Sequence, residues 1–296
     1  MAKRDLRVGA FLHATLSGYV EDFSACDLQL ERGSADPEIV HDARVAVRRL
    51  RSALRTFETA LDPGWARNVR ETLRGLSDEL SEARDADVMV ERMRAALADI
   101  DPADRPSAGE ILALFEQRRR EAYDRIAATR RSREYGEVMR ALQGAAEPPV
   151  LAARAADRAR TLIVPVLEDV YKRLRKRVRR CGPGPSDEAL HAVRIAAKHL
   201  RYALEALAPI DMSPPRRVAK CVVRLQDVLG EEHDAAGAAR RLREFSADPK
   251  HAFAAGAIAA VERRAVAKAR SSWLAEWHGV ERCIRRERRR APASVS

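Results

Sequence analysis

The sequence is poor in the residues that build β-sheets and aromatic binding sites. Only 5% of its 296 residues are Phe, Trp or Tyr. No stretch shows the sustained alternation of β-branched and polar residues that is typical of a half-buried strand. Ala, Leu and Arg dominate instead, and these residues favour helices. An all-α fold is therefore expected.

Cysteine and long apolar runs are also scarce. The four cysteines, Cys26, Cys181, Cys221 and Cys283, are scattered and form no Cys-x-x-Cys pair. This argues against a disulfide scaffold and against a thiolate zinc site. The N-terminus has no apolar signal segment, and no apolar run approaches the length of a membrane span. We therefore expect a cytoplasmic protein that does not enter membranes.

Positive charge, in contrast, is in excess. The formal net charge is +11 and the isoelectric point is about 10.0. Self-repulsion opposes folding, so a strongly basic chain commonly has an anionic partner. The charge is unevenly placed, because residues 1–148 carry −3 and residues 149–296 carry +14. The second half is expected to supply most of the attraction for an anion.

Apolar residues recur at spacings of three and four along nearly the whole chain, as in amphipathic helices. Breakers rich in Gly, Pro and Asp divide this pattern into eight stretches, four on each side of Gly144–Pro149. The predicted helical stretches are 5–30, 37–61, 65–99, 107–143, 151–180, 187–208, 214–246 and 250–289. Pro165 lies inside the fifth stretch, where it is expected to kink or interrupt a helix.

The two halves of the chain repeat each other. Fourteen residues that begin at His41 align without gaps with those that begin at His191. Six residues that begin at Leu80 align in the same way with those that begin at Leu229. The offset between the blocks changes by one residue, as a loop deletion after a duplication would cause.

This repeat predicts the organisation of the chain. A period of this length indicates two copies of a domain rather than a solenoid. We predict two four-helix bundles related by a pseudo-twofold axis, formed by residues 1–146 and 147–296.

Each copy of the longer block places its basic residues on one face of a helix. At 100° per residue, the basic residues of the first copy fall within an arc of about 80°, opposite an apolar face, and the second copy repeats this. The first stripe is His41, Arg44, Arg48, Arg51 and Arg55, and the second stripe is His191, Arg194, Lys198 and Arg201. We predict that both stripes bind an anion.

The spacing and chemistry of the stripes indicate what kind of anion fits. Like charges three or four residues apart destabilise a helix by roughly 0.2–0.5 kcal/mol per pair, so an anion is expected to face them. The rise from Arg44 to Arg55 is about 16 Å, which suits a chain of phosphates better than one small anion. Arginine predominates over lysine, and its guanidinium binds phosphate oxygens in a bidentate manner.

Both stripe helices begin with strong start signals. Asp36 followed by Pro37, and Ser186 followed by Asp187, are favourable N-cap and first-turn residues. Each histidine then lies near a helix N-terminus among arginines. Both influences disfavour the imidazolium, so we expect His41 and His191 to be neutral at pH 7.

An alternative is that neighbouring carboxylates neutralise the stripes. Charge runs on helices are usually solvated faces with internal ion pairs. The third predicted stretch offers five acids to the first stripe: Glu79, Glu82, Asp85, Asp87 and Glu91. Fewer acids are available to the second stripe, so the ligand hypothesis is favoured there.

At these residues the sequence resembles the CHAD domains, the conserved-histidine α-helical domains. Their mark is two copies of a His-x-x-Arg-x-x-x-(Arg/Lys)-x-x-Arg helix, present here at His41 and His191. The Arg84-Asp85 and His233-Asp234 pairs also resemble the family. The resemblance covers essentially the whole chain.

The resemblance implies two four-helix bundles with a basic cleft, binding of long-chain inorganic polyphosphate through the two stripes, and no established catalytic activity. It implies association with polyphosphate granules or with polyphosphate-metabolising enzymes. Glu205 stands where the first copy has Arg55, so this position is not expected to bind anions. No triphosphate-tunnel signature accompanies the match, so the chain looks like a free-standing CHAD protein.

Other functions find less support in the residues. The stripe histidines lack metal-ligand spacing and are surrounded by guanidinium groups, so no metal site and no cofactor are predicted. His233 beside Asp234 is interpreted as a structural pair. The sequence contains no Gly-rich phosphate loop and no nucleophile elbow, so we do not expect an enzyme.

Sequence-independent binding of nucleic acid is the alternative function. The polybasic segments Tyr171–Arg180 and Arg282–Arg290 would suit it. The stripes, however, carry almost no Asn, Gln or aromatic residues that could read or stack bases.

Overall fold

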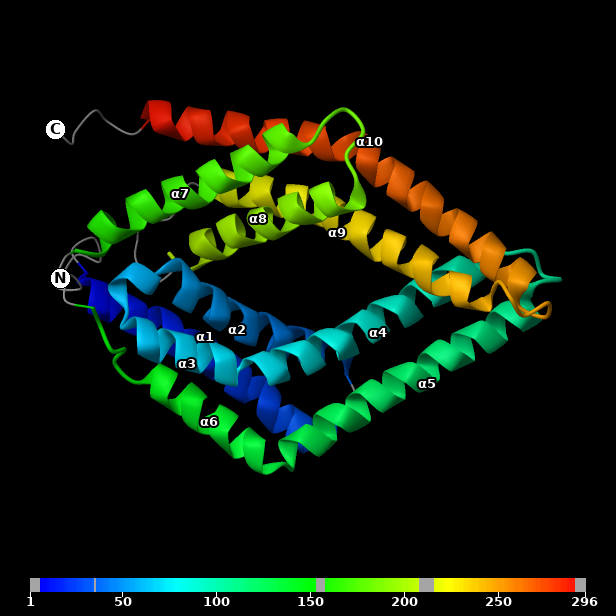
Figure 1. Ribbon diagram of the computed structural model, residues 1–296, viewed down its shortest axis with the longest axis horizontal. Coiled ribbons are helices and arrows are strands. Elements are labelled where there is room, and N and C mark those ends of the chain that lie inside the picture. Colours follow the sequence, from blue (N-terminus) through cyan, green and yellow to red (C-terminus); the bar gives the residue numbers. More distant parts are fainter. Residues whose placement is uncertain (1–5, 35, 153–157, 208–215, 291–296) are drawn as a thin grey trace. The chain divides into compact units, whose positions relative to one another are not determined.

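The computed structural model describes residues 6–34, 36–152, 158–207 and 216–290 (Figure 1). These residues form ten α-helices and two short 3₁₀ helices. Apart from two isolated β-bridges, the described residues contain no β-structure. The predicted all-α fold is confirmed.

The chain packs as two compact units. Unit 1 comprises Met1–Ile163 with Leu242–Ile258, and unit 2 comprises Val164–Arg241 with Ala259–Ser296. The halves 1–146 and 147–296, and their pseudo-twofold relation, remain predictions about the repeat, whereas the two units are defined by packing.

The segment 242–258 packs with unit 1 although it lies far along the chain. Phe245 contacts Phe115 edge-on, with 5.7 Å between the ring centroids. His251 lies between two carboxylates, 2.6 Å from Asp248 and 2.9 Å from Glu110. The hydrogen bonds to Glu110 and Asp248 raise the pKa of His251. These contacts hold the segment 242–258 against the helix Arg105–Arg130 (α5).

Among the described residues, six α-helices lie wholly within unit 1, where the sequence predicts four helical stretches. They are α1 (Val8–Glu31), α2 (Pro37–Thr56), α3 (Pro63–Thr72), α4 (Arg74–Ala98), α5 (Arg105–Arg130) and α6 (Arg133–Ala146). Helix α2 packs against α1 and α4, α4 packs against α5, and α1 also packs against α6. Between the first two helices, Phe11 meets Phe57 edge-on at 5.3 Å.

The prediction of unbroken helices over 65–99 and 107–143 is wrong. The first ends at Leu73, which is fully buried and keeps near-helical dihedral angles, so no turn residue marks the break. The second is interrupted before Ser132, whose hydroxyl accepts a hydrogen bond from the backbone N–H of Tyr135. This serine is an ordinary N-cap that apolar periodicity alone does not reveal.

Unit 2 is built on four helices around one core. They are α7 (Ala159–Arg180), α8 (Asp187–Glu205), α9 (Arg216–Leu242) and α10 (Ala252–Arg290), of which all but α8 also reach into unit 1. Leu174, Val193, Leu225 and Trp277, one from each helix in turn, are buried together. Trp277 also stacks on Tyr171, with 6.2 Å between the ring centroids.

Helix α7 departs from the predicted stretch 151–180. It begins only at Ala159, directly after Arg158, which forms a β-bridge with Arg7. The backbone at 150–152 pairs with the backbone at 60–62. Pro165 lies inside α7 without ending it. The predicted breaker Pro209–Pro215 lies outside the described residues.

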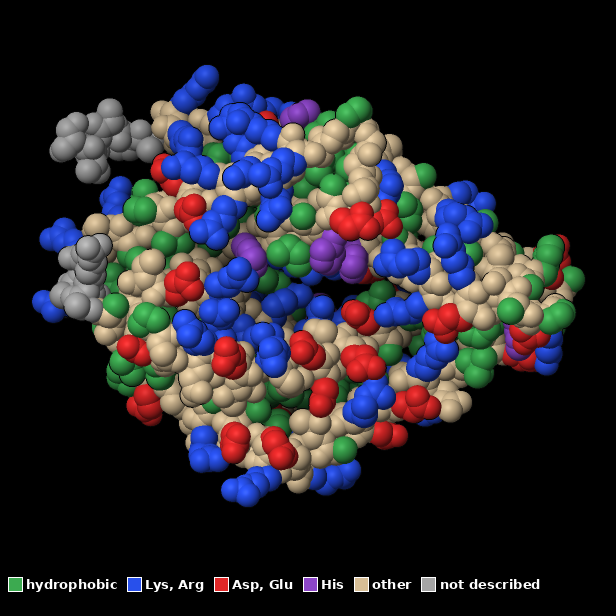
Figure 2. Space-filling view, in the orientation of Figure 1, with side chains coloured by type: hydrophobic (Ala, Val, Ile, Leu, Met, Phe, Trp, Pro, Cys, Tyr) green, Lys and Arg blue, Asp and Glu red, His purple; other side chains and the backbone are tan. Residues whose placement is uncertain are grey.

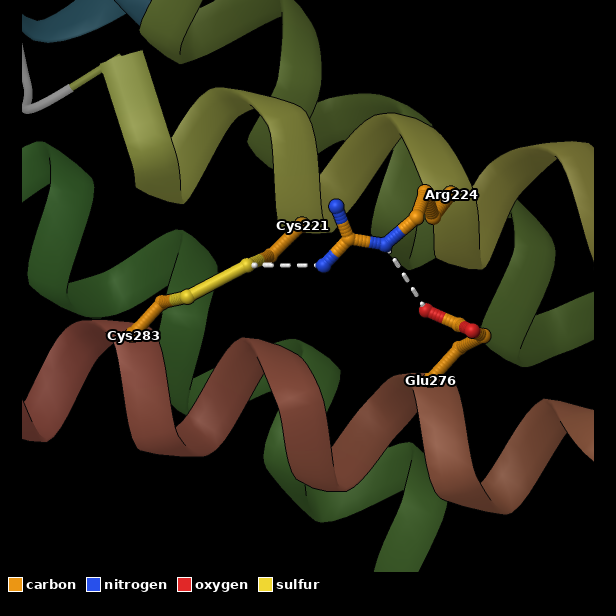
Figure 3. The surroundings of a disulfide bond; sticks show 4 residues. All are labelled: Cys221, Arg224, Glu276 and Cys283. Atoms are coloured by element: carbon orange, nitrogen blue, oxygen red, sulfur yellow. Dashed lines mark hydrogen bonds and ion pairs between the residues drawn. A yellow bond between two sulfur atoms is a disulfide. The ribbon is translucent and has the colours of Figure 1, made fainter.

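A disulfide joins α9 to α10 between Cys221 and Cys283 (Figure 3). Beside it, Arg224 donates to the Sγ of Cys221 at 3.3 Å and to Glu276 at 3.2 Å. The scatter of the cysteines gave no sign of this pairing, because the two residues are 62 positions apart and meet only where two helices run side by side. The expectation that the cysteines form no disulfide scaffold therefore needs this correction.

No helix among the described residues combines the length and the apolar content that crossing a bilayer requires. No group of three or more His, Cys, Asp or Glu residues among them could hold a metal ion.

Candidate functional site

The helices that carry the stripes begin as predicted. The carboxylate of Asp36 accepts a hydrogen bond from the backbone N–H of Glu38 at 3.0 Å, and Pro37 opens α2. The hydroxyl of Ser186 accepts one from the N–H of Ala189 at 3.2 Å and opens α8. These caps fix the first turn, so each stripe histidine follows at the same helical phase.

Packing of the opposite faces fixes where the stripes lie. Leu50 and Leu54 of α2 and Leu200 and Leu204 of α8 are buried. The basic residues on the other side are mostly half-buried, whereas Arg55 and His191 are exposed. Both stripes therefore lie at the border between a packed core and solvent.

The acids of α4 mostly turn away from the first stripe. Three of the five that could have neutralised it contact α5 instead. The pairs are Asp87 with Arg119 at 2.7 Å, Glu82 with Arg125 at 2.5 Å, and Glu79 with Thr129 at 2.8 Å. Arg44 donates its Nε–H to the hydroxyl of Ser81 at 3.1 Å rather than to a carboxylate.

More arginines approach the first stripe from neighbouring helices. Burial and the charge of Arg84, on α4, lower the pKa of His41. Burial lowers the pKa of Arg51, and Arg70 and Arg74 lower it further against the opposing effect of Asp78. The Nδ1 of His41 and the Nε of Arg51 are buried and have no hydrogen-bond partner among the described residues. Positive groups therefore gather around the first stripe, and the nearby carboxylates Asp78, Glu38 and Asp42 oppose them only in part.

The second stripe is partly neutralised within unit 2. Arg201 pairs with Glu205 at 2.5 Å and also donates to the amide oxygen of Gln226. Arg194 lies 3.8 Å from Asp234, a longer ion pair. The sequence predicted that few carboxylates are available to neutralise the second stripe. At these two arginines that prediction is wrong.

Two histidines meet at the second stripe. The rings of His191 and His233 lie 5.1 Å apart between centroids. Burial, followed by the charges of Arg194 and Lys198, lowers the pKa of His191. Burial and the charge of Arg194 lower the pKa of His233 to about 4. Both rings are therefore neutral at pH 7, as expected for His191.

The structure adds two residues that the sequence analysis left outside the site. Arg84 and His233 occupy the same position of the shorter repeated block, and each lies close to the stripe histidine of its own half. His233, interpreted as a structural partner of Asp234, instead faces the second stripe. The repeat could have identified both residues, because equivalent positions of duplicated helices make equivalent contacts.

This arrangement is suited to holding phosphate groups. Guanidinium and imidazole donors lie along each helix, and half-buried guanidinium groups bind oxyanions more strongly than solvated ones do. The CHAD domain family model matches residues 14–243, which is most of the chain. The chain belongs to the CHAD domain family.

Solved structures with a similar fold agree with this assignment. PptA from Streptomyces chartreusis superposes with a TM-score of 0.77 at 21% identity, over 92% of this chain and 100% of that one. The CHAD domain from the plant Ricinus communis gives a TM-score of 0.76 at 24% identity, over 94% of this chain and 93% of that one. At these identities the likeness concerns the fold alone.

Two curated relatives from Mycobacterium tuberculosis are longer than this CHAD protein. The uncharacterized proteins Rv2226 (strain ATCC 25618 / H37Rv) and MT2285 (strain CDC 1551 / Oshkosh) are each 28% identical to it over 232 residues. The match covers 75% of this chain but only 43% of either relative. The chain therefore spans less than half the length of these relatives.

Proposed function

We propose that this CHAD protein binds inorganic polyphosphate through its two basic stripes and acts as a binding protein without catalytic activity. The observation that carries the proposal is the crowding of like charges around Arg51, where Arg70 and Arg74 act against the carboxylate of Asp78, while three of the five α4 acids contact α5 instead. Such crowding is unfavourable in the empty protein and becomes favourable when a polyanion lies along the stripe.

Membership of the CHAD family supports polyphosphate over other anions, since some members bind it. The half-buried arginines support it as well, because they present donors along a helix rather than around one point. A bound polymer would let the protein associate with polyphosphate granules or bring polyphosphate-metabolising enzymes to their substrate, in the cytoplasm.

The test is calorimetric titration of long-chain polyphosphate into stripe variants. We expect Arg44→Gln, Arg51→Gln, Arg55→Gln to weaken binding at least tenfold, because each lost guanidinium removes one or two charge-assisted hydrogen bonds. Arg194→Gln, Lys198→Gln, Arg201→Gln is expected to weaken it as well.

A matched control separates a local site from net charge. The triple variant Arg263→Gln, Arg264→Gln, Lys268→Gln removes the same charge from exposed positions of α10. It is expected to change the dissociation constant less than twofold. Equal losses in the stripe variants and in this control would contradict the proposal.

A further inference from the structure

Unit 2 carries a second strongly basic surface that contains no stripe residue. It is formed by α7 and by the end of α10 nearest the C-terminus, where Lys and Arg side chains gather in Figure 2. We call it the α7–α10 face. Its twelve members are Lys172, Arg173, Arg175, Lys176, Arg177, Arg179, Arg180, Arg282, Arg285, Arg286, Arg288 and Arg289.

Every exposed residue of the two runs is basic. Between 172 and 180 only Leu174 and Val178 are buried, and all the other residues are exposed Lys or Arg. Between 282 and 289 the five exposed residues are all Arg. Neither run exposes an apolar or aromatic side chain.

The two runs lie side by side and form one surface. Arg175 of α7 lies 3.8 Å from Glu281 of α10, and Arg288 lies 3.7 Å from Glu168. Because the residue numbers rise on one helix as they fall on the other, the helices are antiparallel. The guanidinium of Arg288 lies over the ring of Tyr171, 5.6 Å from its centroid. The charges of Arg175, Arg288 and Arg285 all act on this one phenol.

Internal ion pairs neutralise only a minority of this charge. The basic residues that pair with a carboxylate are Lys172, Arg173, Arg175 and Arg288. The other eight form no ion pair with any residue that the structure describes. Three arginines in the last turn of α7 are favourable to the helix dipole, but this accounts for a small part of the set.

We propose that the α7–α10 face binds the phosphate backbone of double-stranded nucleic acid without regard to sequence. Ten of its twelve residues are arginines, which bind phosphate oxygens in a bidentate manner. The exposed residues include no Asn, Gln or aromatic side chain, so the face lacks the residues that read adenine or stack unpaired bases, and its contacts are expected to be mainly with phosphates.

The shape of the face favours a duplex over other polyanions. Packed helices have axes roughly 8–10 Å apart, so the face presents two rows of arginines. A duplex likewise presents two phosphate strands, which border grooves about 6 and 12 Å wide, and long arginine side chains from two neighbouring helices can contact both strands. An anionic bilayer fits less well, because a helix that lies in a membrane surface buries an apolar face there.

The experiment measures binding of the full chain to a fluorescent mixed-sequence DNA duplex by anisotropy at several salt concentrations. The face variant is Arg179→Gln, Arg286→Gln, Arg289→Gln, which breaks no ion pair with a described residue. The control is again Arg263→Gln, Arg264→Gln, Lys268→Gln, with the same change in net charge. Thermal melting by circular dichroism checks that both variants fold.

We expect the face variant to bind the duplex at least tenfold more weakly. Its slope of log K against log[salt] is expected to become shallower by about 2 to 3, because three phosphate contacts are lost. The control is expected to stay within twofold of the unmodified protein, and a second duplex of unrelated sequence is expected to bind equally well.

Three results would overturn this inference: equal losses in both variants, no loss in the face variant, or binding of anionic phosphatidylserine vesicles through the face in place of the duplex. The inference does not depend on polyphosphate binding, because it rests on different residues. Loss of polyphosphate binding in the stripe variants, with duplex binding retained, would show that the two sites are separate.

Discussion

At the residue scale, Glu205 decides how much the second stripe can bind. It stands where the first copy of the repeat has Arg55, and its carboxylate lies 2.5 Å from the Nε of Arg201. A phosphate chain must compete with this carboxylate for the guanidinium. Glu205 therefore weakens anion binding by the second stripe in two ways. It replaces a cation of the first copy, and it neutralises Arg201.

Glu205→Gln is accordingly expected to tighten polyphosphate binding several-fold, because it releases the guanidinium of Arg201 and removes one repelling charge. Competition titration with long-chain polyphosphate measures the change. Glu137→Gln, which removes an exposed acid from α6, controls for net charge. Unchanged or weaker binding in Glu205→Gln would mean that Arg201 takes no part in the site.

The histidines make polyphosphate binding depend on pH. In the empty protein the pKa values of His41, His191 and His233 are all lowered, chiefly by burial. A bound polyanion reverses the local field and raises these pKa values, so protons are taken up on binding. Linkage then requires binding to tighten as the pH falls from about 7.5 to 6, because binding is accompanied by proton uptake.

Calorimetry in buffers of different ionisation enthalpy measures this proton uptake directly. The variant His41→Gln, His191→Gln, His233→Gln is expected to lose most of the uptake at pH 6.5 while it keeps much of its affinity at pH 8. An uptake as large as that of the unmodified protein would show that other groups titrate and that the histidines are structural.

At the element scale, the disulfide between α9 and α10 closes a loop across a sequence separation of 62 residues. A cross-link of this span stabilises the folded state by roughly 4 kcal/mol, mainly through restriction of the unfolded chain. Cys221→Ser with Cys283→Ser is expected to lower the free energy of unfolding in urea by about 2–4 kcal/mol. Cys181→Ser, at a free cysteine, serves as the control.

Thiol titration of the denatured, unreduced protein tests the bond itself. Two reactive thiols, from Cys26 and Cys181, are expected. Four would contradict the disulfide. Disulfides are uncommon in the reducing cytosol, so the count also bears on the predicted cytoplasmic location.

The elements that could be predicted from the sequence are those with local signals. The caps at Asp36 and Ser186 and the apolar faces of α2 and α8 follow from residues within a few positions of one another. The break at Leu73 and the pairing of Cys221 with Cys283 depend on tertiary packing, which no local pattern encodes. His233 is an intermediate case. Its position in the repeat predicts that it lies near His191, whereas its residue type alone does not.

At the scale of the whole molecule, the excess positive charge of the second half lies mainly outside its stripe. Residues 149–296 carry +14, yet two arginines of the second stripe are paired with acids. Most of the excess lies on the α7–α10 face, whose twelve basic residues are largely without carboxylate partners among the described residues. The net charge of each half therefore does not predict which stripe binds polyphosphate more tightly.

The most direct test of the account is binding of polyphosphates of graded length, from tripolyphosphate to the long polymer, over a range of salt concentrations. A stripe that rises about 16 Å predicts that long chains bind much more tightly per molecule than tripolyphosphate. With roughly six to eight phosphates neutralised, the slope of log K against log[salt] is expected to be about −5 to −7. Equal dissociation constants for tripolyphosphate and the long polymer, or affinity that does not change with salt, would contradict polyphosphate binding along the stripes.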